Sequence, residues 1–262
     1  MKSLTDIAYV SGGARQQKLD IFQPMVESGP LATILMLHGG SGKRGDMYQA
    51  AIHFVNQGFQ VILIGFRDYP DYFYPDPVED VFCAVAWMGE TSDEFGFQMD
   101  RLIGLGHSFG GTLVSSLAVV KEPELYLQGC EQSWPEETRF IAVVPFTGIF
   151  NYEKAAAKNT GLLDYVNAYL GNRIGEIPED WSQASPSSWV NGQEPPFLLI
   201  HGQDDTNIPP SFSKEFADLL TENGVTVQLD LIEGMDHNGI TKSEEIYSLV
   251  DEFLSSILGE LP

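Results

Sequence analysis

The chain has 262 residues, which is near the upper limit for one hydrophobic core, so we expect a single domain over 1–262. Fourteen basic residues against 37 acidic residues give a formal net charge of −23. Such a charge repels phosphate backbones and anionic lipid surfaces, which argues against nucleic-acid and membrane partners. We interpret it first as a highly soluble surface and only second as a field that steers substrates. Whether the chain forms a homodimer is left open.

The two cysteines are too few for a disulfide scaffold. Cys83 lies in the apolar run 81–85 and is interpreted as a small buried hydrophobic residue. No CxxC or HExxH spacing suggests a metal site, and no cofactor is implied. The N-terminus lacks the apolar region of a signal peptide, and no stretch is long enough to span a bilayer. A cytoplasmic protein is the default expectation, although a processed mature form would look the same.

Short β-type runs alternate with helical patterns along the chain, which predicts a mostly parallel sheet flanked by helices. The first two strands form a pair around the turn Ser11-Gly12-Gly13. We expect strands over 6–10, 17–22, 32–37, 59–65, 101–105, 140–144, 197–200 and 225–232. Helices are expected over 76–88, 112–120, 153–170, 213–223 and 243–258.

The segment 151–196 separates two of the predicted parallel strands. It begins with the helical stretch 153–170 and continues as a polar segment that contains Pro and Trp. Structureless loops of this length are rare in compact domains. We therefore expect a small cap or lid insertion within the single domain.

The sequence Gly106-His107-Ser108-Phe109-Gly110 fits the pattern G-x-S-x-G. In that pattern a serine sits on a strained turn between a strand and a helix, and small flanking residues prevent clashes. The pattern alone occurs by chance, but here an apolar strand precedes it and a helix follows. Ser108 is therefore the predicted nucleophile, and a glycine-rich turn with an incidental serine is the alternative.

A serine hydroxyl needs a base to take its proton. With this strand order the acid and then the base should follow the serine in the chain. Only two of the five histidines, His201 and His237, lie after Ser108. His237 follows the last strand in a loop, whereas His201 ends a buried strand, where it is expected to bond locally. We therefore predict His237 as the base.

The acid should come from the loop after strand 197–200, where Asp204 and Asp205 are adjacent. Its task is to orient the imidazole and to stabilise the imidazolium. For the oxyanion, His38-Gly39-Gly40 ends an earlier strand with unhindered backbone N–H groups. Gly39 and Gly40, together with the N–H of Phe109, are the predicted oxyanion hole, and His38 itself is expected to be structural.

Taken together, these pieces resemble the α/β-hydrolase family, in particular the esterase and lipase group that carries an HGG loop. The matching segments run in the family's order over nearly the whole chain: 19–22, 38–40, 75–80, 106–111, 201–205 with Ile208-Pro209, and His237. The resemblance implies a sheet of about eight strands, a carboxylic-ester substrate and Asp205 rather than Asp204 as the acid. Ser41 after the glycines and Phe109 after the serine place the chain nearer to short esterases, arylformamidase-like and feruloyl-esterase-like enzymes.

The sequence thus predicts a serine carboxylesterase that hydrolyses small esters through an acyl-enzyme. Two alternatives stay open: an amide hydrolase of arylformamidase or exopeptidase type on the same site, and a non-catalytic receptor for small ligands. Aromatic residues near the expected site are interpreted either as pocket walls or as ordinary core and surface residues: Tyr69, Tyr72, Phe73, Tyr74, Tyr152, Tyr165, Tyr169 and Trp181.

Overall fold

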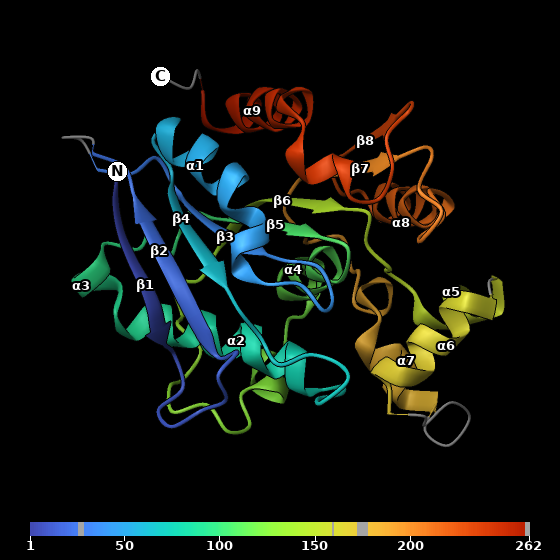
Figure 1. The fold of residues 1–262 in the computed structure, drawn as a ribbon, viewed down its shortest axis with the longest axis horizontal. Helices are drawn as coiled ribbons and strands as arrows, with labels where there is room; N and C mark the ends of the chain where they lie inside the picture. Colours follow the sequence, from blue (N-terminus) through green and yellow to red (C-terminus); the bar gives the residue numbers. More distant parts are fainter. Residues whose placement is uncertain (26–28, 159, 172–177, 260–262) are drawn as a thin grey trace.

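A single eight-stranded sheet runs through the molecule in the order β1-β2-β4-β3-β5-β6-β7-β8 (Figure 1). The computed structural model describes residues 1–25, 29–158, 160–171 and 178–259. The strands are β1 (Lys2–Ala8), β2 (Lys18–Gln23), β3 (Thr33–Leu37), β4 (Gln60–Ile64), β5 (Leu102–His107), β6 (Phe140–Phe146), β7 (Phe197–Gly202) and β8 (Val227–Ile232). β1 and β2 pair antiparallel, β2 pairs antiparallel with β4, and all pairs from β4 to β8 are parallel. The predicted fold class, a mostly parallel sheet of about eight strands, is confirmed.

Helices cover both faces of this sheet, as parallel strands require. The α-helices are α1 (Tyr48–Asn56), α2 (Asp76–Glu90), α3 (Ser92–Phe95), α4 (Phe109–Val119), α5 (Tyr152–Lys158), α6 (Thr160–Tyr169), α7 (Pro178–Ala184), α8 (Ser211–Glu222) and α9 (Glu244–Leu258). Short 3-10 turns are η1 (Arg44–Met47), η2 (Pro123–Tyr126), η3 (Pro186–Ser188) and η4 (Gly239–Lys242). Apolar residues of α1 and α9 join one buried cluster with one face of the strands, and those of α2, α4 and α8 join a second cluster on the other face.

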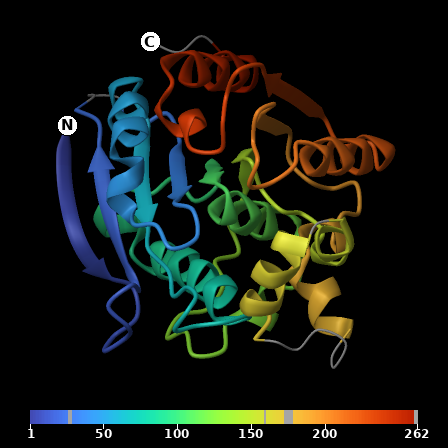
Figure 2. The same ribbon diagram turned by 45° about the vertical axis from the view of Figure 1, so that its right-hand side comes forward.

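The central strands read as continuous apolar runs because both of their faces are covered. Every residue of β3, β4, β5 and β7 is buried. Since the carboxyl ends of parallel strands meet at one edge, the loops after β3, β4, β5, β7 and β8 gather there. α5, α6 and α7 group beyond the end of β6, away from α1 and α9 (Figures 1 and 2).

Three expectations about helices need correction. The expected single helix 153–170 is two helices, α5 and α6, and residue 159 between them lies outside the described part of the chain. Gly161 weakens helix propensity at the start of α6. The polar segment that follows is not a loop throughout, because it contains α7 and η3. A helix at Tyr48–Asn56 was not expected, although Ala50, Ala51, Phe54 and Val55 form its buried face at helical spacing.

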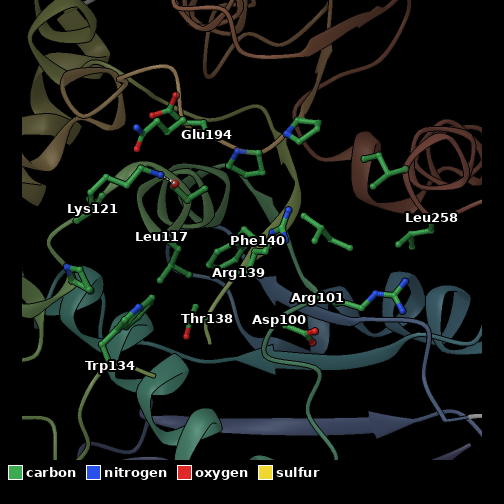
Figure 3. A pocket seen from close by; sticks show the side chains of 18 residues that line it. Asp100, Arg101, Leu117, Lys121, Trp134, Thr138, Arg139, Phe140, Glu194 and Leu258 are labelled. Carbon is green, nitrogen blue, oxygen red and sulfur yellow. Dashed lines mark hydrogen bonds between the residues drawn. The ribbon is translucent and has the colours of Figure 1, made fainter. Parts of the chain in front are cut away.

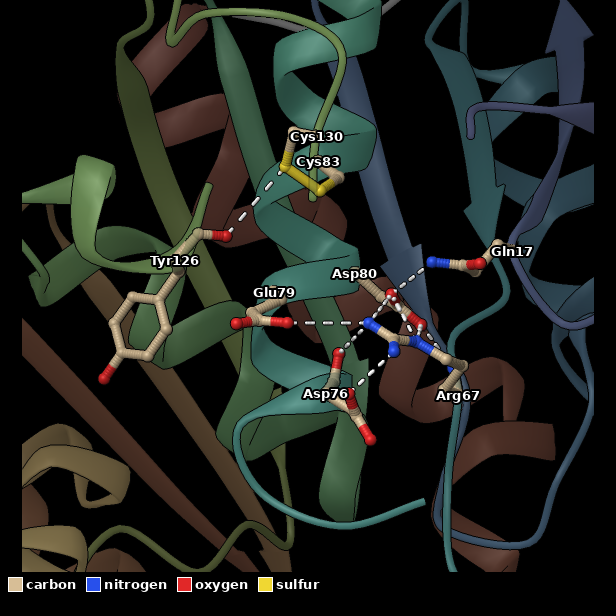
Figure 4. The surroundings of a disulfide bond; sticks show 8 residues. All are labelled: Gln17, Arg67, Asp76, Glu79, Asp80, Cys83, Tyr126 and Cys130. Atoms are coloured by element: carbon tan, nitrogen blue, oxygen red, sulfur yellow. Dashed lines mark hydrogen bonds and ion pairs between the residues drawn. A yellow bond between two sulfur atoms is a disulfide. The ribbon is translucent and has the colours of Figure 1, made fainter. Parts of the chain in front are cut away.

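The interpretation of Cys83 as a free hydrophobic residue is wrong. Its sulfur is bonded to that of Cys130, 47 residues further along, and this disulfide ties α2 to the loop after η2 (Figure 4). Burial of the cysteine was foreseen, since Cys83 is 3% exposed. The pairing depends on a long-range approach of the two chain segments, which spacing in the sequence does not reveal.

The start of α2 is held by Arg67, the third residue after β4. Its guanidinium lies 2.6 Å from an oxygen of Asp76 and 2.8 Å from an oxygen of Asp80, and Glu79 lies 3.6 Å away (Figure 4). The Asp80 carboxylate has no exposed surface, so its charge depends on this partner. In the described part of the chain, no helix is both long enough and apolar enough to cross a membrane.

Candidate active site

Ser108 lies at the sharp turn between β5 and α4. Its backbone has φ of 55° and ψ of −119°, a conformation that L-residues adopt only under strain. The turn tolerates no side chain on either flank: a Cβ at Gly106 would overlap the carbonyl of Gly110, and one at Gly110 would overlap the carbonyl oxygens of Leu37 and His38. The glycines of the G-x-S-x-G pattern are therefore required by backbone contact, and the turn places the Ser108 side chain at the carboxyl edge of the sheet.

His237 reaches Ser108 from the loop after β8. Its Nε2 atom lies 3.0 Å from Ser108 Oγ, and its Nδ1 atom lies 2.7 Å from Asp205 Oδ2. An ionised carboxylate only accepts hydrogen bonds, so Nδ1 carries the proton and Nε2 is left to accept the serine hydroxyl. The arrangement brings together three residues that lie 129 and 32 positions apart in the sequence.

Asp205 is fixed by several donors besides His237. Its Oδ1 atom accepts the backbone N–H groups of Asn207 and Ile208 at 2.8 and 2.9 Å. Burial favours the neutral acid, but hydrogen bonds from His201, His237 and Ile208 outweigh it and hold the pKa of Asp205 well below its usual range. The neighbouring Asp204 is exposed, and within the described residues no hydrogen bond or ion pair joins its side chain to the imidazole. The structure thus brings Asp205, and not Asp204, to His237.

His201 makes local contacts, as expected. Its Nδ1 atom lies 2.7 Å from Ser213 Oγ, and its Nε2 atom lies 2.9 Å from the carbonyl oxygen of Ile208 and 3.2 Å from Asp205 Oδ2. This buried ring therefore holds the loop that carries Asp205 rather than reaching Ser108.

His107 also belongs to the site, and the sequence reasoning gave it no role. Its Nε2–H donates to the carbonyl oxygen of His237 at 2.7 Å, which holds the loop that carries the imidazole. Burial lowers the pKa of His107 to about 4, so the ring is neutral at pH 7. Its position inside the G-x-S-x-G pattern was the available signal, because that residue necessarily neighbours the serine.

Gly39, Gly40 and Phe109 surround Ser108 on its other side. A Cβ at Gly39 would lie 3.4 Å from the Cβ of Ser108, and one at Gly40 would lie 3.6 Å from the Cβ of Phe109. Within the described residues, no hydrogen bond occupies the backbone N–H of Gly40 or that of Phe109. Two free donors therefore lie beside the serine, one of them at the N-terminus of α4. His38 stacks on Phe66 with ring centroids 4.4 Å apart, in keeping with a structural role.

Asp68 anchors the glycine loop and was also missed. Its Oδ2 atom accepts the N–H of Ser41 at 2.6 Å, and its Oδ1 atom accepts the N–H of Tyr69 at 2.7 Å. Ser41 has a φ of 55°, so the loop departs from a relaxed backbone directly after Gly40. Asp68 is one of two aspartates in the loop after β4 and belongs to no recognisable motif, which is why the sequence did not point to it.

A cavity of about 530 Å³ opens beside Ser108 and His237. Three of the aromatic candidates, Tyr69, Tyr152 and Tyr165, line it, together with Leu162 of α6 and Ile208. The other aromatic candidates are not among its lining residues: Tyr72, Phe73, Tyr74, Tyr169 and Trp181. No cluster of three or more His, Cys, Asp or Glu side chains that could hold a metal ion occurs among the described residues.

A larger hollow of about 860 Å³ lies at the opposite edge of the sheet, where β5, β6 and β7 begin (Figure 3). Lys121 and Arg101 lie on opposite sides of this hollow, and Lys121 donates to the carbonyl of Ala118 (Figure 3). Among its described lining residues there is no nucleophile with a neighbouring base. The chemistry-bearing groups therefore belong to the smaller cavity.

Comparisons with known proteins agree with this geometry. The model of the BD-FAE protein family matches residues 19–220. Esterase LipQ of Mycobacterium tuberculosis is 27% identical over 267 residues, which cover 97% of this chain and 62% of LipQ. Kynurenine formamidase avaC of Aspergillus versicolor is 30% identical over 169 residues, covering 56% of this chain and 55% of avaC. The chain thus spans little more than half of the length of these relatives.

Among solved structures, esterase B of Lactobacillus rhamnosis superposes with a TM-score of 0.83 at 23% identity, covering 98% of this chain and 86% of esterase B. At that identity the likeness establishes the fold, which is that of the α/β-hydrolases.

Proposed function

The chain belongs to the BD-FAE family, and from that premise we propose that it is a serine carboxylesterase that hydrolyses small carboxylic esters. The observation that carries the proposal is the imidazole of His237, which lies within hydrogen-bond distance of both Ser108 Oγ and Asp205 Oδ2. Esterase LipQ, whose name describes the same activity, supports the substrate class.

In the proposed reaction, Ser108 Oγ attacks the ester carbonyl while His237 Nε2 takes its proton. Asp205 stabilises the imidazolium that forms. The backbone N–H groups of Gly39, Gly40 and Phe109 donate hydrogen bonds to the negatively charged oxygen of the tetrahedral intermediate. His237 then returns the proton to the leaving alcohol, which leaves an acyl group on Ser108. Water, deprotonated by His237, attacks this acyl-enzyme and releases the carboxylic acid.

Hydrolysis of p-nitrophenyl acetate, butyrate and decanoate by the wild type and by Ser108→Ala tests the proposal. Loss of the nucleophile should lower kcat by a factor of about 10³ or more. Ser248→Ala, which removes an exposed hydroxyl on α9, is the matched control and should leave the rates unchanged. Equal activity of the wild type and Ser108→Ala would contradict the assignment, and tight binding of an unhydrolysed ester would favour the receptor alternative.

Amide hydrolysis on the same site is the second candidate, favoured by the similarity to kynurenine formamidase avaC. The same nucleophile, base and oxyanion donors serve both reactions, so the cavity decides between them. Turnover of a formanilide, an aminoacyl anilide and an aryl ester should therefore be compared. A higher kcat/KM for the formanilide than for the aryl ester would replace the esterase proposal.

We also propose that the segment 151–196 acts as a cap over the site within the single domain. Supporting this, Tyr152 of α5 and both Leu162 and Tyr165 of α6 line the cavity.

The expected cytoplasmic location conflicts with the disulfide between Cys83 and Cys130, because disulfides are rare in the cytosol. A cytoplasmic location requires Cys83 and Cys130 to be thiols in the cell. Alkylation in freshly lysed host cells under denaturing conditions, which expose buried thiols, followed by mass spectrometry, decides this. Two labelled cysteines support the cytoplasm, and none contradicts it.

A further inference from the structure

We propose that this site prefers esters that carry an ammonium group, which the carboxylate of Asp68 and the aromatic walls of the cavity bind beside the reacting carbonyl. The inference rests on the proposed esterase function and names its substrate class. Its starting point is the charge of the cavity. Among the described lining residues, Asp68 is the one carboxylate and none is Lys or Arg.

Asp68 lacks a cationic partner. The hydrogen bonds to its carboxylate come from the backbone N–H groups of Ser41 and Tyr69, and no basic side chain of the described residues forms an ion pair with it. The neighbouring Arg67 is engaged by Asp76, Glu79 and Asp80 at the start of α2 (Figure 4). Asp68 is half-buried, and burial raises the pKa of its carboxyl against the opposing effect of the two N–H groups, as expected where no counter-charge is near.

The walls around this carboxylate suit a cation. Tyr69, Phe109, Tyr152 and Tyr165 line the cavity, and an ammonium group placed over the face of such a ring would gain cation–π attraction. Tyr152 has no exposed surface and forms part of the packed wall of this cavity.

The position of Asp68 relative to the glycine loop favours an ammonium group over a neutral hydroxyl. A side chain at Gly40 would begin 3.6 Å from Asp68 Oδ2 and 3.6 Å from the hydroxyl of Tyr165. The negative charge of the tetrahedral intermediate thus forms close to a carboxylate, which repels it. A hydroxyl leaves this repulsion in place, whereas a positive charge on the substrate compensates both anions. The net charge of −23 adds a field that attracts cations.

The test compares esters that differ only in charge. On the acyl side, alanine ethyl ester is compared with ethyl isobutyrate, in which a methyl group replaces the ammonium. On the alcohol side, acetylthiocholine is compared with 3,3-dimethylbutyl thioacetate. The measured quantity is kcat/KM for the charged ester divided by kcat/KM for the neutral ester. It is measured at pH 6, where an α-amino group with a pKa of about 7.7 is protonated. The quotient for wild type is divided by that for Asp68→Asn, so that intrinsic reactivities cancel.

We expect this quotient to fall at least about 10-fold in Asp68→Asn in one of the two series, which also identifies the side that carries the charge. Asp71→Asn removes the same charge from an exposed position of the same loop and should leave the quotient unchanged. An equal loss of activity on all four esters would mean that Asp68 only holds Ser41, and an unchanged quotient in both series would likewise overturn the proposal. If none of the four esters is hydrolysed, the esterase function itself fails instead.

Discussion

At the scale of single residues, His107 connects the nucleophile turn to the loop of His237. Its ring is buried and neutral, with a pKa of about 4 against about 6.5 in the unfolded chain. The unfolded state therefore binds more protons than the folded state between these values, and stability falls as the pH drops through this window. Above pH 6.5 the neutral His107 ring makes its full contribution to the free energy of unfolding.

We predict that His107→Gln, which keeps a donor for the carbonyl of His237, flattens this dependence. Between pH 7 and pH 4.5, the free energy of unfolding of wild type should fall by about 2 kcal/mol more than that of the variant. Urea unfolding at both pH values measures the difference. Gln57→Ala, which removes a side chain that donates to Asp251, is a control that leaves the titration of His107 intact. Identical pH dependence in wild type and His107→Gln would show that the ring does not titrate in this range.

At the scale of elements, α6 forms one wall of the cavity through Leu162, which is buried, while Asp164 on the same helix faces solvent. Leu162→Trp should fill cavity space and lower kcat/KM for p-nitrophenyl decanoate relative to acetate by about 10-fold, the effect of one or two displaced methylene groups. Asp164→Trp adds the same side chain outside the cavity and should leave the ratio unchanged. If Leu162→Trp leaves this ratio unchanged, α6 does not contact the acyl chain of the substrate.

The disulfide between α2 and the loop after η2 belongs to the same scale. It closes a loop of 47 residues, and the loss of chain entropy in the unfolded state corresponds to about 4 kcal/mol. Dithiothreitol should therefore lower the Tm of the wild type. The double variant Cys83→Ala/Cys130→Ala should have the same Tm as the wild type in dithiothreitol, and the reductant should not change the Tm of the variant. A wild-type Tm that dithiothreitol leaves unchanged would contradict the prediction.

At the scale of the whole molecule, the charge of −23 is a source of self-repulsion in the compact state. Screening shortens the reach of this repulsion from about 30 Å at 0.01 M salt to below 10 Å at 0.3 M. We predict that the Tm rises between 10 and 300 mM NaCl, and scanning calorimetry at both concentrations checks it. A Tm that falls with salt would indicate that ion pairs such as that of Arg67 with Asp80 outweigh the repulsion.

Much of the molecule was within reach of the sequence. The strands were predictable because buried parallel strands are continuous apolar runs. The role of the glycines at 106 and 110 was predictable because only glycine fits between closely approaching backbones. Ser108 and His237 could be named as candidates because the order of strands places their loops at one edge of the sheet. The same order indicated the loop of the acid, but the choice of Asp205 over Asp204 came from the resemblance to the α/β-hydrolase family. Their catalytic roles stay predictions until the variants are measured.

The tertiary structure alone decided the interactions between segments that are distant in the chain and carry no local pattern. The bond between Cys83 and Cys130, the hydrogen bond from His107 to the carbonyl of His237, and the contact of Asp68 with Ser41 are of this kind. Each depends on how loops of different strands approach one another after the sheet has formed. Periodicity and motif spacing report on the elements themselves, whereas the charge and shape of the cavity arise only where their ends meet.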